Sequence, residues 1–152
     1  MADASPLQTR LQEDLKTAMR AREEVRVGTI RLLLADLKNA SIEKMATLSP
    51  QDELVLLAKQ KKQREESIAA FEAGGRSDLV ARERAELVVI LDYLPSQLDE
   101  AAVRARVAEV VAETGATSRK EMGKIMGRLS AETKGRFPGD QLKRLVEEAL
   151  PA

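Results

Sequence analysis

Apolar residues recur at three- and four-residue intervals along most of the chain, and this spacing predicts amphipathic helices. The first helix is expected after Ser5, which can cap it, with Pro6 at the first helical position. Its apolar stripe consists of Leu7, Leu11, Leu15 and Met19. The polar run 20–24 is expected to contain the turn into a second helix, whose stripe consists of Val27, Ile30, Leu33, Leu34, Leu37 and Ile42.

Two further helices are expected before Pro95. The third lies between Pro50, which follows a capping serine, and Gly74, because glycine accommodates the left-handed end of a helix without steric strain. The fourth is expected to be capped by Ser77 or Asp78. It should end before Pro95, since the residue that precedes a proline is disfavoured in the helical conformation.

Three shorter helices are expected after this point. Asp99 caps the first, Ser118 opens the second with a capping box, and the third follows Pro138. The fold prediction is therefore all-α. It consists of an N-terminal helical bundle over residues 1–95 and a small C-terminal three-helix domain over residues 96–152.

The composition removes much of the usual enzyme chemistry. The chain has no Cys and no His, which excludes thiol nucleophiles, cysteine or histidine metal sites and the Ser-His-Asp arrangement. Adjacent carboxylates such as Glu65 and Glu66 point about 100° apart on a helix, so they do not converge as an acid–base couple. We expect no catalytic residue, no metal and no cofactor. A Lys or Glu acting as a base is the alternative, but no convergent group of residues supports it.

The location is predicted from the apolar pattern and the first residues. No apolar run approaches the length of a membrane span, and the start of the chain does not resemble a signal peptide. These observations predict a cytoplasmic protein that does not bind membranes. Aromatic residues make up 2% of the chain, which disfavours an RNA reader that stacks bases on aromatic rings.

Positive charge is concentrated near the C-terminus, although 25 basic and 25 acidic residues balance over the whole chain. Residues 119–144 hold eight basic and three acidic residues. Lys120, Lys124 and Arg128 recur every four residues, so one helix would align them about 6 Å apart along its axis. Such a row can follow a nucleic-acid backbone. The alternative is an ordinary solvated helix face.

Two other features leave alternatives open. Gly123 and Gly127 lie inside the same predicted helix, where each costs about 1 kcal/mol relative to alanine. Close packing of another helix, or close approach of a ligand, would offset this cost. The basic run 59–64 could contact phosphates, but it is more simply a solvated face with Lys61–Glu65 and Lys62–Glu66 neighbours one turn apart.

Several motifs together resemble the GatB/YqeY family of bacterial helical proteins. The stretch 62–79, from Lys62 to Leu79, is similar to the YqeY signature, and 93–98 is similar to the joint between its two parts. The stretch 122–127, followed by Lys134-Gly135-Arg136, is similar to the motif that YqeY shares with the tail domain of GatB. GatB is a subunit of the tRNA-dependent amidotransferase.

The resemblance implies a two-part helical fold and contact with tRNA, because the GatB tail domain reaches the tRNA body. Carried over by position, the nucleic-acid-binding residues are Lys120, Lys124, Arg128, Lys134 and Arg136. The resemblance also carries the label of a carbon–nitrogen ligase with glutamine as amide donor, which belongs to the full amidotransferase. We therefore expect a non-catalytic tRNA-binding accessory module. The alternative is an adaptor that docks on an aminoacyl-tRNA synthetase or an amidotransferase.

Overall fold

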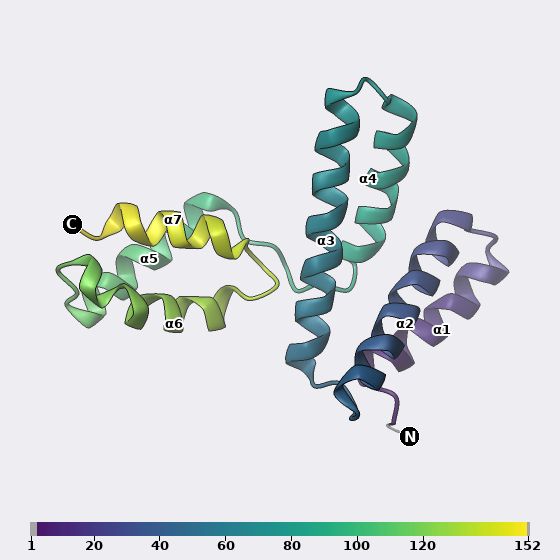
Figure 1. Ribbon diagram of the computed structural model, residues 1–152, viewed down its shortest axis with the longest axis horizontal. Helices are drawn as coiled ribbons and strands as arrows, with labels where there is room; N and C mark the ends of the chain where they lie inside the picture. Colours follow the sequence, from purple (N-terminus) through teal and green to yellow (C-terminus); the bar gives the residue numbers. More distant parts are fainter. Residues whose placement is uncertain (1–2, 152) are drawn as a thin grey trace. The chain divides into compact units, whose positions relative to one another are not determined.

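The computed structural model describes residues 3–151, and this part of the chain is all-α, as predicted. It contains seven α-helices and one short 3-10 turn, and no β-strand. The elements, labelled in Figure 1, are α1 (Pro6–Arg20), α2 (Glu24–Lys44), α3 (Pro50–Ala73), α4 (Ser77–Leu91), α5 (Glu100–Thr114), η1 (Arg119–Glu121), α6 (Met122–Thr133) and α7 (Gly139–Ala149).

Side-chain caps start several elements at the positions that the sequence predicts. Ser5 and Ser49 form full capping boxes at α1 and α3, and Ser118 does so at η1. The carboxylate of Asp99 accepts the backbone N–H of Ala102 at 2.7 Å. Each cap satisfies backbone donors that have no partner inside the helix.

α4 differs from the prediction at its start, and it ends before Pro95 as predicted. Its N-cap is Arg76, without a side-chain hydrogen bond, so neither Ser77 nor Asp78 caps the helix. The helix ends at Leu91, and a short turn leads from there to Pro95. The restriction that proline imposes on its predecessor is therefore met in a turn rather than at the last helical residue.

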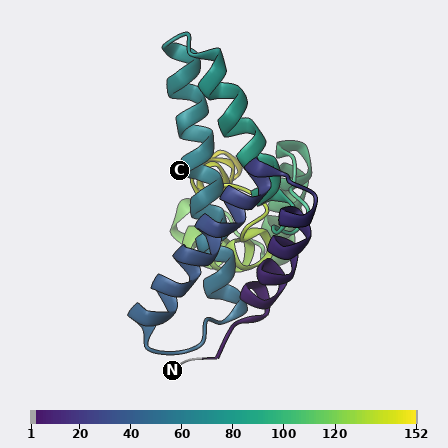
Figure 2. The same ribbon diagram turned by 90° about the vertical axis from the view of Figure 1, so that its right-hand side faces the viewer.

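The chain divides into two compact units between Leu94 and Pro95. In unit 1, α1 pairs with α2 and α3 pairs with α4 as antiparallel hairpins (Figure 1). The glycine-containing end of the α3–α4 hairpin extends beyond α2 (Figure 2). The fully buried core of unit 1 includes Leu11, Ile30, Leu33, Leu37, Leu57 and Ile90.

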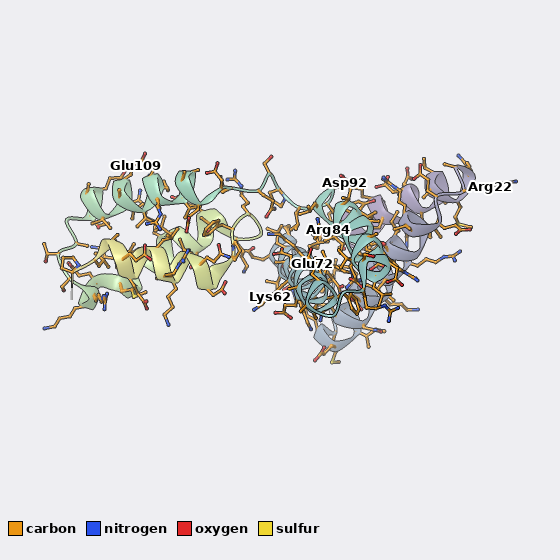
Figure 3. All side chains as sticks on the ribbon, turned by 90° about the horizontal axis from the view of Figure 1, so that it is seen from above. Arg22, Lys62, Glu72, Arg84, Asp92 and Glu109 are labelled. Atoms are coloured by element: carbon orange, nitrogen blue, oxygen red, sulfur yellow. The ribbon has the colours of Figure 1, made fainter. Side chains whose placement is uncertain are left out.

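Ion pairs connect α3 and α4 of unit 1. Arg64 Nε on α3 lies 2.9 Å from Glu86 Oε2 on α4, and the Arg64 side chain is 12% exposed. Nearer the end of the same hairpin, Arg84 pairs with Glu72 (Figure 3). Arg64, which belongs to the basic run 59–64, is therefore held by carboxylates of its own unit.

Unit 2 is a three-helix arrangement of α5, α6 and α7 around its own core. The apolar stripes predicted for these helices supply that core, which includes Val103, Val107, Val110, Ile125, Leu129, Leu142, Leu145 and Val146. The valine-rich α5 is a helix, as its three- and four-residue spacing predicts, although valine is a mediocre helix former. Packing of this apolar face outweighs the low propensity.

Candidate functional site

The three residues predicted to align on one helix, Lys120, Lys124 and Arg128, do not all lie on it. Lys120 lies in the 3-10 turn η1, because the Ser118 capping box starts a 3-10 turn and α6 begins only at Met122. Lys124 and Arg128 are the two members that α6 carries. Since a 3-10 turn advances differently from an α-helix, the spacing of four residues does not continue back to Lys120.

Arg128 is neutralised by carboxylates of its own unit. Its Nη2 donates to Glu113 on α5 at 2.5 Å, and its Nε lies 4.0 Å from Glu132 one turn further along α6. Glu132 also accepts two hydrogen bonds from Arg106, both at 2.8 Å. The hydrogen bonds from Arg106 hold the pKa of Glu132 below its ordinary value, so the carboxylate keeps its charge.

The remaining predicted residues have different surroundings. Arg136 is half-buried, and its Nε donates to the backbone carbonyl of Ser96 at 2.8 Å, which ties the start of unit 2 to the turn after α6. The side chains of Lys120, Lys124 and Lys134 make no hydrogen bond or ion pair within residues 3–151. Their role in binding stays a prediction.

The two glycines of α6 face open space. A Cβ placed on Gly123 or Gly127 would meet no atom within 4 Å of the neighbouring structure. The explanation that another helix packs closely on them is therefore wrong within the described residues. Their cost to the helix is not offset by contacts inside unit 2.

A groove runs between α2 and α3 in unit 1, with a volume of about 930 Å³. Leu32 on α2 and Val55 and Leu56 on α3 contribute apolar side chains to it. Leu32 remains 41% exposed and Val55 52% exposed, although many other large apolar residues of this unit are buried. α2 thus has apolar residues on its outer side in addition to the core face.

The walls of this groove carry different charges. α2 contributes Asp36 and Glu43, whereas α3 contributes Lys59. At the loop between the helices, Lys44 and Asp52 pair with each other. Lys44 and the backbone N–H of Ser49 both donate to Asp52, which lowers the pKa of this carboxyl to about 2.

A polar bridge crosses the groove. Gln60 on α3 is 7% exposed, and its amide nitrogen donates to Asp36 on α2. The other end of the amide, Oε1, is buried and has no hydrogen-bond partner in the described structure. Gln60 therefore places a polar, incompletely satisfied group among the apolar residues.

The groove was not predicted from the sequence, although two of its apolar residues already lie outside the predicted core stripes. Leu32 lies outside the stripe that the prediction assigned to the second helix, and Val55 likewise lies outside the third helix's stripe. An apolar residue away from the core face marks an exposed apolar position. Such residues cannot show which helices meet, so the groove itself can be recognised only from the tertiary structure.

The predicted Lys61–Glu65 neighbours do pair, at 3.5 Å.

The described residues offer neither a metal-binding cluster nor a membrane-spanning helix. No group of three or more acidic, Cys or His side chains there is arranged to hold a metal ion. No helix in residues 3–151 has the length and apolar character needed to cross a membrane.

The family model for YqeY-like proteins matches residues 8–150. The chain belongs to this family. The resemblance inferred from the sequence is thereby confirmed for YqeY.

Similar proteins occur in fungi under the name altered inheritance of mitochondria protein 41, mitochondrial. The Pyrenophora tritici-repentis protein is 31% identical over 94% of this chain and 80% of its own length. The Lachancea thermotolerans protein is 40% identical over 68% of this chain. The Eremothecium gossypii protein is 40% identical over 55% of this chain. The matched parts span 57% and 46%, respectively, of the last two relatives.

These comparisons correct three expectations. The relatives' names mention neither tRNA nor an amidotransferase, so the expected tRNA-binding accessory module and its adaptor alternative are wrong. The relatives are fungal and are named as mitochondrial, which contradicts the expectation of a bacterial, cytoplasmic protein. The ion pairs of Arg128 supply a physical reason for the first correction, because they remove one of the charges on which it rested.

Proposed function

We propose that this chain is a protein-binding module that receives a segment of a partner protein in the groove between α2 and α3. The exposed apolar surface in that groove carries the proposal. Leu32 and Val55 lie on two different helices and both line the same groove. Apolar surface gathered in a groove and bordered by charged residues is typical of binding sites.

The energetics favour occupation of the groove. Covering the exposed parts of Leu32 and Val55 would contribute about 1 kcal/mol each, because full burial of such a side chain contributes about 1.5–3 kcal/mol. Leu56 lies half-buried next to Val55 on α3 and adds apolar contact area. Leu32 lies toward the end of the groove away from the loop and Val55 toward the loop, so a partner that covers all three side chains must extend along the groove.

The test replaces the apolar contacts by charge. The double variant Leu32→Asp/Val55→Asp places carboxylates in the groove, whereas the control Val88→Asp changes a residue of α4 that is 61% exposed and lies outside it. Each protein carries a photo-crosslinker and is incubated with an extract of the source organism. Crosslinked proteins are identified by mass spectrometry, purified and titrated against all three forms.

We expect a partner that binds the wild type and Val88→Asp equally and binds the groove variant at least about tenfold more weakly, which corresponds to about 1.4 kcal/mol. Circular dichroism of each variant checks that the helices persist. A partner that binds the folded groove variant as tightly as the wild type would overturn the proposal, as would the absence of any partner that rebinds when purified.

A further inference from the structure

The charges and length of the groove indicate what kind of segment binds in it. The inference about this segment rests on the proposed function. We infer that the bound segment is an amphipathic α-helix of a partner protein, with basic residues along the flank that faces α2 and acidic residues along the flank that faces α3. Its apolar stripe would cover Leu32 and Val55.

The length of the groove fits a helix of about three turns. On α2 the lining residues run from Leu32 to Lys44, and on α3 they run from Asp52 to Arg64. Each stretch rises about 18 Å along its helix axis at 1.5 Å per residue. An elongated groove between two helices, with apolar residues along its length and polar residues at its borders, is a geometry in which proteins bind an amphipathic helix through residues spaced three and four apart.

The charges that border the groove differ between its two walls. Asp36 receives a hydrogen bond from the neutral Gln60, which leaves its negative charge uncompensated, and Glu43 makes no ion pair within residues 3–151. On the opposite wall, Lys59 likewise makes no ion pair with a described residue. The α2 wall is therefore negative and the α3 wall is positive.

The other charged residues of the groove are already paired. Lys44 and Asp52 neutralise each other near the loop, and Arg64 is held by Glu83 and Glu86. A helix with flanks of opposite charge complements Asp36, Glu43 and Lys59 together, whereas a helix with two like-charged flanks meets repulsion along one wall.

A second copy of this chain fits the groove less well. If α2 of each copy entered the groove of the other, the symmetry would bring the two α2 helices together. Asp36 and Glu43 of one copy would then approach the same acidic residues of the other copy. Partner proteins with a mixed-charge helix avoid this repulsion.

Three designed helical peptides test the inference. All have about 18 residues and the same leucine stripe, which gives an isolated helix enough length to form. One peptide has lysine on one flank and glutamate on the other, one has lysine on both flanks, and one has glutamate on both. Each carries a fluorescent label, and binding to the full chain is measured by anisotropy at low salt.

We expect the mixed peptide to bind at least about fivefold more tightly than either other peptide, since a few rim charge pairs each contribute modestly. In the variant Asp36→Lys/Glu43→Lys, both walls become positive and the glutamate peptide should bind most tightly. The control Glu13→Lys/Asp140→Lys has the same change in net charge outside the groove and should keep the preference for the mixed peptide.

The outcomes separate this inference from the proposed function. Equal binding of all three peptides, lost in Leu32→Asp/Val55→Asp, would overturn the charge pattern and leave the protein-binding groove standing. If no peptide binds at about 0.5 mM while a purified partner still requires the groove, the helical occupant is wrong. Failure of both peptides and partner would overturn both. A dimer that the groove variant converts to monomers would identify a second copy as the occupant and overturn the inference.

Discussion

Glu53 of α3 accepts the backbone N–H of Leu7 in the first turn of α1, at 3.1 Å. Glu53 is 7% exposed, so a carboxylate from a distant part of the chain satisfies a buried helix-terminal donor. The other carboxylate oxygen, Oε1, is buried without a hydrogen-bond partner among the described residues. This contact joins the start of α1 to the second hairpin of unit 1.

Replacing Glu53 by alanine should destabilise unit 1 by about 2 kcal/mol, because the buried N–H of Leu7 loses its acceptor. Glu53→Gln keeps an acceptor oxygen and should be considerably milder. Urea denaturation followed by far-ultraviolet circular dichroism measures both variants. Equal destabilisation by alanine and glutamine would show that the hydrogen bond to Leu7 contributes little.

The pH dependence of stability should also change in Glu53→Gln. Burial raises the pKa of Glu53 above its ordinary value of 4.5, which outweighs the opposing effect of the Leu7 hydrogen bond. The folded state therefore favours the protonated form, and this contribution to stability is lost as the pH rises from 4.5 through the folded-state pKa. As the pH rises through this range, the free energy of unfolding of the wild type should fall relative to that of Glu53→Gln. A constant difference between pH 4 and pH 7 would contradict the assignment.

The start of α3 should show the opposite dependence on pH. The hydrogen bonds with Lys44 and Ser49 lower the pKa of Asp52 from its ordinary value of 3.8 to about 2. The ionised carboxylate therefore stabilises the fold fully above pH 3.8, and this stabilisation is lost as the pH falls through about 2. Ser49→Ala removes the N-cap hydroxyl and should cost about 1 kcal/mol at neutral pH. The thermal midpoint, measured as a function of pH from neutral to acid, reports both the loss of stabilisation by Asp52 and the cost of Ser49→Ala at neutral pH. Ser67→Ala, in the interior of α3, is the control and should leave the midpoint nearly unchanged.

Alanine substitutions in α6 should stabilise unit 2. Neither new methyl group would meet a neighbouring atom. Gly127→Ala should therefore raise the free energy of unfolding by about 1 kcal/mol, and Gly123→Ala should raise it somewhat less because Gly123 lies in the first turn of α6. Gly115→Ala is the contrasting variant: its φ of +69° is strained for alanine, so stability should fall. Chemical denaturation compares the three. A loss of stability in Gly127→Ala would show that its surroundings are more crowded than the open space described.

Tyr93 should resist ionisation until the chain unfolds. Burial, followed by the hydrogen bond that its hydroxyl donates to Asp14 at 2.5 Å, raises its pKa well above the ordinary value of 10.0. Tyr93 is the only tyrosine, and the chain has no tryptophan, so phenolate absorbance reports on this residue alone. In an alkaline titration, phenolate should form together with the loss of helical circular dichroism. Phenolate formation before any loss of helix would contradict this prediction. Tyr93→Phe should lower stability by about 1.5 kcal/mol.

The helices were largely predictable because their signals are local. The capping boxes at Ser5 and Ser49 connect residues only three apart, and the apolar stripe of α7 already separates Leu142 and Leu145 from its polar face. Deviations arose where two local preferences compete. At Ser118 the capping box produces a 3-10 turn, which removes Lys120 from the helical row.

The candidate site could not be predicted to the same extent. Arg128 looked free in the sequence, but Glu113 neutralises it from α5, fifteen residues away. Leu32 and Val55 share a groove only because α2 and α3 diverge from their connecting loop. The relevant distances are set by packing in the core rather than by spacing along the chain.

The amino-acid order alone determined the family, the all-α class and most helix starts, because these depend on neighbouring residues and on the periodicity of apolar positions. The three-dimensional packing decided which charges remain available and which apolar side chains stay uncovered. Both depend on neighbours from other helices: Glu113 approaches Arg128, and no described segment covers Leu32 and Val55. Coulomb attraction and burial act through space, so they emerge only when the helices have packed.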